Sequence, residues 1–314
     1  MSNKGDKFKK TKVLVILGPT ASGKTSLGVR LARKYNGEII SADSRQVYRG
    51  MDIGSGKDLA EYLVDGQAIP YHLIDVVDPQ TEFNLADYQK LAFVAIEDIS
   101  KRGCLPIIVG GSGLYLQAVV DNYNLSAIKP DVKKRSLLDS LSREQLFARL
   151  EKLKPEFAGQ LNNSDKNNPR RLVRYLEILE TDESAPPKIE SPYDFLLLGL
   201  DWPDDILRER IKQRIITRLE NEDMIGEVSR LQTDGLSWQR LCSFGLEYKF
   251  ISYYLLDKLS YEEMIEKLSI ASYRFAKHQK TWFRRWEKQG RKIEWVKDKI
   301  EAENLINQYF GSSE

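Results

Sequence analysis

The stretch "VLVILGPTASGKTSLGVR", residues 13–30, decides the fold class of this chain. Its first five residues are apolar, as in a buried strand, and the residues that follow Lys24 open a helical pattern. Between the two lies the motif Gly-x-x-x-x-Gly-Lys-Thr, from Gly18 to Thr25, in the strand, loop and helix setting in which it binds phosphate. The stretch therefore predicts a phosphate-binding loop in an α/β fold.

The predicted loop offers a phosphate three kinds of contact. Its successive backbone N–H groups form an anion nest at a helix N-terminus, where the helix dipole adds roughly half a positive charge. Lys24 supplies a full charge, and the Thr25 hydroxyl can ligate Mg²⁺. The cradle consists of Gly18, Pro19, Thr20, Ala21, Ser22, Gly23, Lys24 and Thr25. The motif alone does not establish ATP as the ligand.

Short apolar runs recur along the chain and are separated by helical patterns. After residues 13–17 they occur at residues 38–40, 72–77, 106–109 and 195–200. This alternation predicts a P-loop-like parallel sheet that is flanked by helices on both faces. Ligands of such a sheet bind at the carboxyl ends of its strands.

Strand signals are absent from residues 122–168, which are polar, helical and interrupted by loops. We expect a small all-helical insertion here, within a core that is formed by residues 1–121 and 169–314. The core should end in long helices over residues 204–231 and 247–288.

The composition is that of a soluble globular protein. The 314 residues are 41% hydrophobic and 30% charged, and a net charge of +2 is too small to indicate a nucleic-acid partner by itself. Cys104 and Cys242 lie far apart and support neither a disulfide framework nor a zinc site. The first apolar run is too short for a signal or membrane segment. We expect a cytoplasmic protein without membrane contact, and a monomer, because no heptad seam is present.

A second polar cluster follows the second predicted strand, in "SADSRQVYRGMDIGSGK", residues 41–57. Asp43 lies just past that strand, beside the phosphate site of a parallel sheet, where a carboxylate can bind metal, accept a proton, or simply cap a following helix. Asp75 in "YHLIDVVDP" is a further acidic candidate, equally compatible with a metal role and with a strand-end role. The same loop as Asp43 carries Ser44, Arg45, Gln46, Tyr48 and Arg49.

Seven segments, taken in order, resemble the tRNA dimethylallyltransferases, the IPP transferase family of tRNA isopentenyltransferases. They are "GPTASGKT", "SADSRQVYRGMDIG", "HLIDVVDP", "FNLADY", "PIIVGGSGLYLQAVV", "RRLVRYLEI" and "RFAKHQKTWFRRW". The resemblance implies transfer of a dimethylallyl group from dimethylallyl diphosphate to the exocyclic N6 amine of the adenosine immediately 3′ of the anticodon. The phosphate loop then holds diphosphate, with Mg²⁺ as the implied cofactor.

The same resemblance implies three catalytic residues. Asp43 takes the role of the base that removes a proton from the adenine amine. Ser112, in "GGSG", stands where the family usually has threonine, and its hydroxyl can contact the amine or the leaving oxygen. The diphosphate-binding arginine corresponds to Arg214 in "LRERIKQRIITRL", with Arg210 as the alternative on the same helix face.

A basic and aromatic segment near the C-terminus fits an RNA partner. Residues 270–292 contain eight Lys/Arg residues and one acid, Glu287, and helical spacing predicts a buried stripe of Phe275, Trp282 and Trp286 opposite a basic face. By resemblance, the contacts to the tRNA anticodon stem-loop are Asp43, Ser44, Arg45, Gln46, Arg170, Arg171, Arg174, Lys277, Arg284 and Arg285. Alternatively, Arg174 pairs with Glu177 or Glu180. The resemblance also implies a further contact region at "SFGLEY", residues 243–248, where this sequence departs from the usual family pattern.

Three other functions remain open at this stage. An adenylate dimethylallyltransferase would act on free nucleotide, and a P-loop nucleotide kinase would transfer a phosphoryl group. A non-catalytic RNA-binding protein would have little use for a magnesium and diphosphate site. The basic C-terminal helix and the arginine-rich "PRRLVR", residues 169–174, favour tRNA over free nucleotide. The departures, among them Arg45 in place of the methionine of the bacterial pattern, bear on tRNA selectivity.

Overall fold

The computed structural model describes residues 10–125, 132–180 and 190–311, and the chain divides into two compact units. The first unit comprises Met1–Asp121 and Ser191–Glu314, and the second comprises Asn122–Glu190. None of the helices in the described ranges is long and apolar enough to span a membrane.

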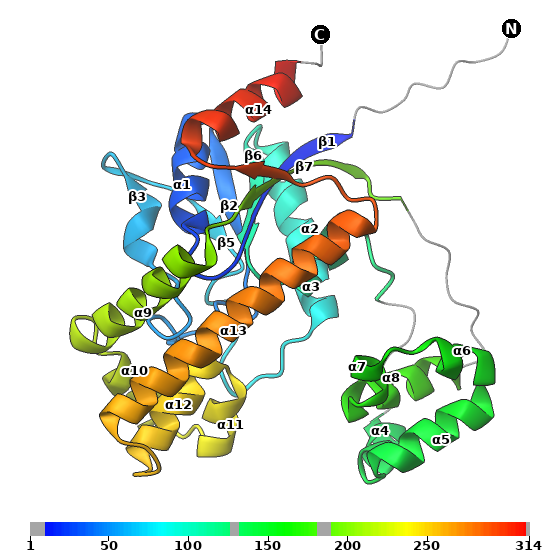
Figure 1. Cartoon of the computed structure of the whole chain (residues 1–314). Helices are drawn as coiled ribbons and strands as arrows, with labels where there is room; N and C mark the ends of the chain where they lie inside the picture. Colours follow the sequence, from blue (N-terminus) through cyan, green and yellow to red (C-terminus); the bar gives the residue numbers. More distant parts are fainter. Residues whose placement is uncertain (1–9, 126–131, 181–189, 312–314) are drawn as a thin grey trace, which may run out of the picture. The chain divides into compact units, whose positions relative to one another are not determined.

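The first unit is built on a six-stranded parallel sheet with the strand order β5-β2-β6-β1-β7-β8 (Figure 1). The strands are β1 (Thr11–Leu17), β2 (Gly37–Ala42), β5 (Tyr71–His72), β6 (Leu105–Gly110), β7 (Tyr193–Leu200) and β8 (Glu294–Val296), and β3 (Leu63–Val64) pairs with β4 (Gln67–Ala68) in a separate hairpin after the short helix η1 (Leu59–Tyr62). The P-loop-like parallel sheet predicted from the sequence is confirmed.

One predicted strand is largely wrong. The apolar run at residues 72–77 contributes only its first residue, because β5 ends at His72. Leu73 and Asp75 have left-handed backbone angles, φ 63° and φ 56°, which cannot continue a strand.

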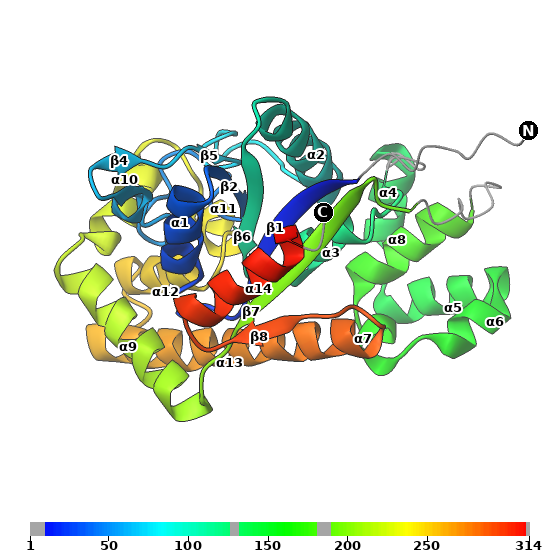
Figure 2. The same ribbon diagram turned by 90° about the horizontal axis from the view of Figure 1, so that it is seen from above.

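Helices cover both faces of the sheet (Figure 2). They are α1 (Lys24–Lys34) and α14 (Lys299–Gly311) on one face, and α2 (Leu85–Lys101) and α3 (Gly113–Val120) on the other. Successive residues of a strand point to opposite faces, so Val13 and Val15 join the core under α2 and α3, whereas Leu14 and Ile16 join the core under α1. All four side chains are at most 1% exposed.

A helical region forms a third apolar core of the first unit. Its helices are α9 (Asp204–Glu220), α10 (Met224–Thr233), α11 (Trp238–Ser243), α12 (Leu246–Leu255) and α13 (Tyr261–Lys288). The two long helices predicted here are each divided. Asp223 and Asp257 adopt left-handed angles, φ 58° and φ 54°, and interrupt them. Val47 and Met51 of the loop after β2 are buried in this core, which joins that loop to the helices.

The second unit is all-helical, as predicted, but its boundary differs from the prediction. It contains α4 (Val132–Asp139), α5 (Arg143–Leu153), α6 (Pro155–Gln160), α7 (Asn163–Lys166) and α8 (Pro169–Leu179). The sequence predicts an insertion that ends at residue 168, which would assign α8 to the core formed by residues 1–121 and 169–314. Instead its apolar face, with Leu172 and Leu176 at 0% exposed, packs against Leu146 and Leu150 of α5. The unit therefore extends to Glu190.

Candidate active site

A cavity of about 230 Å³ lies at the carboxyl ends of β1, β2 and β6. Three loops that follow these neighbouring strands line it, and α9, α12 and α13 contribute the rest of the wall. Nine of the catalytic, diphosphate-binding and tRNA-binding residues predicted from the sequence line this one cavity: Thr20, Lys24, Thr25, Asp43, Ser44, Arg45, Gln46, Ser112 and Arg214. The predicted clustering of the phosphate loop with the polar loop after β2 thus holds.

The phosphate loop wraps the N-terminus of α1. Gly23, in a left-handed conformation with φ 90°, precedes the helix, and the first intrahelical bond runs from Leu27 N to Gly23 O. The N–H groups of residues 23–26 have no carbonyl one turn earlier within the helix, so they are available to an anion, whereas Ser22 N donates to Pro19 O at 3.3 Å. Not every amide of the loop is available, because Thr20 N donates to Gln279 Oε1 at 2.8 Å.

Three cations line the cavity without an ion-pair partner in the described part of the chain: Lys24, Arg45 and Arg214. Burial lowers the pKa of Lys24 to about 7, Arg214 adds to this effect, and Asp43 opposes it. Burial also lowers the pKa of Arg214 to about 10, with a further contribution from Arg218. Two depressed cationic pKa values in one cavity indicate a site whose positive charge is compensated by a bound anion.

The arginines of α9 differ in what they contact. Arg214 donates to Thr20 Oγ1 and lines the cavity. Arg210 is exposed; it donates to Ala21 O at 2.8 Å and lies 5.1 Å from the Trp202 ring, outside the cavity wall. Of the two arginines considered from the sequence, Arg214 has the position from which a cavity ligand can be reached.

Arg218, one turn after Arg214, was missed in the sequence. It is 4% exposed and pairs with both oxygens of Asp58, at 2.7 and 3.0 Å. Glu247 of α12 completes this charged wall, and burial raises its pKa although Arg214 and Arg218 oppose the change.

Asp43 and Ser112 lie on adjoining loops. Asp43 Oδ1 accepts a hydrogen bond from Arg45 N at 2.8 Å, and the segment that follows is a turn, so Asp43 does not cap a helix. Ser112 N donates to Ala42 O at 3.3 Å, and Ser44 N donates to Ser112 Oγ at 3.4 Å. Gly110 permits this close approach, since a Cβ there would lie 2.2 Å from Ala42 O.

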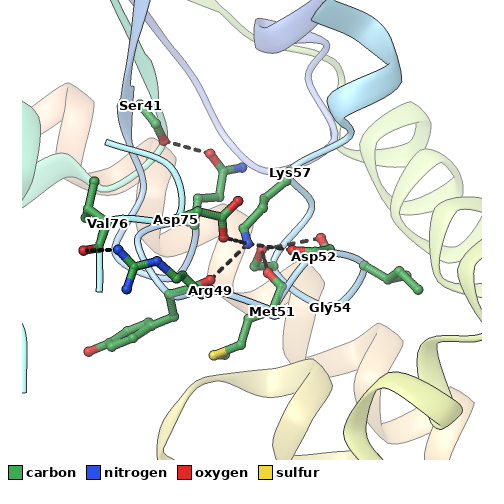
Figure 3. A network of polar contacts seen from close by, with 12 residues as sticks. Ser41, Arg49, Met51, Asp52, Gly54, Lys57, Asp75 and Val76 are labelled. Carbon is green, nitrogen blue, oxygen red and sulfur yellow. Dashed lines mark hydrogen bonds and ion pairs between the residues drawn. The ribbon is translucent and has the colours of Figure 1, made fainter. Parts of the chain in front are cut away.

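A buried lysine anchors the loop after β2 (Figure 3). Lys57 is 1% exposed, and its Nζ donates to Tyr48 O at 2.9 Å, to Asp52 Oδ1 at 2.6 Å and to Asp75 Oδ1. Asp75 does not line the cavity, so of its two alternatives the structural role is the one that its contacts support. The Gln46 carboxamide also stabilises this loop, because it accepts a hydrogen bond from Ser41 Oγ and donates one to Gly56 O.

Glu227 of α10 holds the same loop from the other side. Its buried carboxylate accepts hydrogen bonds from Asp52 N, Ile53 N and Gly54 N at 2.7–3.0 Å, and from the Tyr248 hydroxyl at 2.9 Å. The sequence carries one signal for it: an acid beside the buried stripe of an amphipathic helix. These four hydrogen bonds to Glu227 hold the loop that carries Asp43 against the helical region.

We expect Glu227→Ala to destabilise the protein strongly, because three backbone N–H groups lose their acceptor. Leaving them unsatisfied should cost about 3 kcal/mol of the free energy of unfolding, which corresponds to a fall in Tm of roughly 6–12 °C. Tyr248→Phe, which removes only the phenolic donor, is the control and should cost about 1 kcal/mol. Thermal unfolding followed by circular dichroism checks both variants. Equal Tm values for Glu227→Ala and the parent would contradict the stabilising role of Glu227.

Apart from Arg45, which lines the cavity, the basic residues predicted to contact tRNA divide into two groups. On α13, Lys277, Arg284 and Arg285 are exposed. The aromatic stripe is only partly as predicted: Trp286 is 1% exposed and Trp282 packs against the core, but Phe275 is 46% exposed. Lys280, counted among the basic residues, is buried in ion pairs with acids at residues 201 and 204.

The predicted tRNA contacts of the second unit lie on α8. Arg170 and Arg171 are exposed, and Arg171 pairs with Asp165 at 2.5 Å. Arg174 pairs with Glu177 at 3.2 Å, which is the alternative that the sequence left open for it.

The fold and the cavity define a P-loop protein whose positively charged anion-binding site lies next to a carboxylate. A group-transfer enzyme that acts on a phosphorylated donor requires this combination. The sequence model of the IPP transferase family matches residues 46–286. The chain is 47% identical over 299 residues to tRNA dimethylallyltransferase 1 of Syntrophus aciditrophicus, covering 92% of this chain and 95% of that protein. This chain belongs to the IPP transferase family.

One further relative and two solved structures agree with this assignment. The chain is 40% identical over 301 residues to tRNA dimethylallyltransferase 1 of Parabacteroides distasonis, covering 95% and 96% of the two chains. The structure of a tRNA isopentenylpyrophosphate transferase from Bacillus halodurans superposes with a TM-score of 0.67 at 37% identity, covering 97% and 96%. A eukaryotic dimethylallyltransferase acting on tRNA gives a TM-score of 0.74 at 30% identity, covering 87% and 69%.

Proposed function

We infer that this chain is a tRNA dimethylallyltransferase, which transfers the dimethylallyl group of dimethylallyl diphosphate to the N6 amine of the adenosine immediately 3′ of the anticodon. One observation carries this inference: a single cavity joins a phosphate loop and two partly buried cations, Lys24 and Arg214, to the Asp43 and Ser112 pair. Relatives that share 40–47% of the sequence over almost the whole chain bear the name of this enzyme.

The phosphate end of the cavity supports departure of the diphosphate. The bond between the allylic carbon and the bridging oxygen breaks, and its electron pair goes to the diphosphate. Lys24, Arg214 and the N–H groups at the start of α1 stabilise the charge that develops there, because they are fixed in place before the reaction. The same positive groups hold the donor in the ground state.

The carboxylate end of the cavity supports attack by the adenine. As the new bond forms between the amine nitrogen and the allylic carbon, the amine must lose a proton, and Asp43 accepts it. The Ser112 hydroxyl, held beside Asp43 by the contact with Ser44 N, orients the amine. The products are the prenylated adenosine and free diphosphate.

Magnesium fits the donor side of the cavity. The Thr25 hydroxyl lines the cavity beside Lys24 and Asp43, and in the described ranges no group of three His, Cys, Asp or Glu residues could hold a metal by itself. Such a donor set suits Mg²⁺, which is usually held by few protein oxygens together with phosphate oxygens and water. We propose Thr25 as its protein ligand. When bound, the ion neutralises charge on the diphosphate.

The exposed arginines and lysine of α13, and those of α8, supply positive charge for the anticodon stem-loop. The adenine must leave its stacked position before its amine can enter the cavity.

One assay tests this function against its alternatives. The protein is incubated with dimethylallyl diphosphate and Mg²⁺ and with either unmodified tRNA or AMP, and the products are analysed by mass spectrometry. Prenylated adenosine in tRNA is the expected result. Prenylated AMP with unchanged tRNA would contradict it, as would ATP turnover in a parallel reaction without prenylation.

Binding of diphosphate should depend on pH through Lys24. Its pKa of about 7 means that the ligand-free side chain loses its proton as the pH rises through 7, and an anion recaptures it. Affinity for inorganic diphosphate should therefore fall above pH 7, by up to about ten-fold per pH unit. Calorimetry at pH 8 in two buffers of different ionisation enthalpy should show uptake of about one proton.

Lys24→Arg is the matched control, because guanidinium stays charged throughout this range. Protonation of the ligand itself is the same for both proteins, so the difference between them isolates Lys24. Identical pH slopes and proton uptake for the two proteins would show that Lys24 is already charged in the free enzyme.

A further inference from the structure

One side of α13 lines the active-site cavity with residues whose role the reaction scheme leaves open. Ser272, Phe275 and Gln279 are spaced three and seven residues apart, so they share a helix face, and all three line the cavity. Gln279 marks the phosphate end, because its carboxamide accepts from Thr20 N at 2.8 Å and donates to Gly111 O at 2.9 Å. Ser272 lies two turns earlier, roughly 10 Å along the helix axis.

Ser272 presents a buried hydroxyl that nothing satisfies. The residue is 4% exposed, and its Oγ has no hydrogen-bond partner among the residues that the structure describes. A buried polar group without a partner is unfavourable, and native proteins satisfy nearly all of them. Because Ser272 lines the cavity, a ligand with a polar edge can supply the missing partner.

Phe275 presents an apolar ring at the same place. It is 46% exposed, whereas the other Tyr, Trp and Phe side chains of α13 are buried or partly buried, and it is flanked by the exposed cations Arg274 and Lys277. An exposed aromatic side chain among cations is the surface on which an unstacked nucleobase binds.

We propose that Ser272 and Phe275 form the subsite for the acceptor adenine, whose ring stacks on Phe275 while a polar atom of its edge bonds to the Ser272 hydroxyl. This proposal rests on the proposed function. A five-carbon allyl group has no polar atom for Ser272, and the diphosphate occupies the opposite end of the stripe, next to Thr20 and Gln279. The cavity also contains Asp43 and Ser112, so a base held here has its amine near the reacting groups.

A binding cycle between protein and RNA tests the proposal without turnover. The affinity of an anticodon stem-loop RNA is measured by fluorescence anisotropy, with either adenine or an abasic nucleotide at the acceptor position. We expect Phe275→Leu to weaken binding of the intact RNA about ten-fold and the abasic change to weaken binding to the parent about ten-fold. The two changes together should weaken it little more than either one. Losses that multiply would place Phe275 away from the acceptor base and overturn the proposal.

Controls on α13 separate this role from a general effect on the helix. Ile270→Ala removes an equally exposed apolar side chain (44% exposed) outside the cavity, and Ser269→Ala removes another buried, unpartnered hydroxyl outside it. Both should leave RNA binding and turnover unchanged. Ser272→Ala should lower kcat/KM for tRNA about ten-fold while leaving the Kd for inorganic diphosphate unchanged.

The outcomes distinguish failure of this proposal from failure of the proposed function. If the parent does not prenylate tRNA, the proposed function is wrong, and the RNA binding cycle still reports whether Phe275 holds a base. If the parent prenylates tRNA and Phe275→Leu and Ser272→Ala do so at the same rate, the subsite is wrong. A weakened KM for dimethylallyl diphosphate in Phe275→Leu, with RNA binding unchanged, would also overturn it by assigning Phe275 to the allyl group.

Discussion

Asp43→Asn should lower kcat about 10³-fold, within the range that general-base catalysis contributes. The amide keeps the oxygen that accepts from Arg45 N, so the turn after β2 should persist. It cannot accept the proton that the adenine amine must lose when its nitrogen bonds to the allylic carbon. Steady-state kinetics with saturating tRNA and dimethylallyl diphosphate measure the loss, and anisotropy should show tRNA binding that is nearly unchanged.

The matched control for this variant is Asp52→Asn in the same loop. Its carboxylate pairs with Lys57 outside the cavity and is 54% exposed, so the substitution should change kcat only a few-fold. If Asp43→Asn kept the parent rate, or if Asp52→Asn lost as much activity, the reaction would need another base and the loop would matter only for its conformation.

The parts of this site that depend on local sequence pattern could be predicted from the sequence. The order of apolar runs predicted the parallel sheet, and the glycine-rich motif predicted the strand, loop and helix around Lys24, because both depend on residues near one another in the chain. The cavity follows from the strand order, in which β2, β6 and β1 are neighbours and bring Asp43, Ser112 and Thr25 to one edge. Polar residues just past predicted strands were sufficient to find them.

The residues that hold the loops in place could not be found in this way. Glu227 and Gln279 bond to backbone groups of segments remote in sequence, and Lys57 bonds to Tyr48 O of its own loop and to the Asp75 carboxylate. In a linear pattern, polar residues of this kind look like solvent-facing ones. The same limit explains the domain boundary. The apolar stripe of α8 predicts that the helix packs on something, but it does not say which core receives Leu172 and Leu176.

For Phe275, the helical spacing was predicted correctly but the burial was not. Its spacing from Trp282 and Trp286 fits one helical stripe, and the two tryptophans do pack against the core beneath α13. The stripe runs past the end of that core, however, and Phe275 then borders the active-site cavity. An amphipathic pattern over 28 residues therefore covers two environments, one of them a binding site.

Two of the arginines of α9, Arg210 and Arg214, allow the leaving-group mechanism to be tested with a matched pair. Arg214 lines the cavity beside Thr20, and its charge persists at neutral pH because its pKa is lowered only to about 10. The negative charge on the diphosphate grows as the allylic bond breaks, so this guanidinium should bind the transition state more tightly than the substrate. Arg214→Ala should therefore lower kcat about 10²–10³-fold.

Arg210→Ala removes the same side chain one helical turn earlier, where it is exposed and contacts the carbonyl of Ala21. Because Arg210 does not line the cavity, its loss should lower kcat less than about ten-fold, through the shape of the loop alone. Arg214→Lys should fall between the two, since a single ammonium replaces a fork of donors. Kinetics of the three variants decide the assignment: a larger loss for Arg210→Ala, or a change in KM without a change in kcat for Arg214→Ala, would remove Arg214 from the stabilisation of the leaving diphosphate.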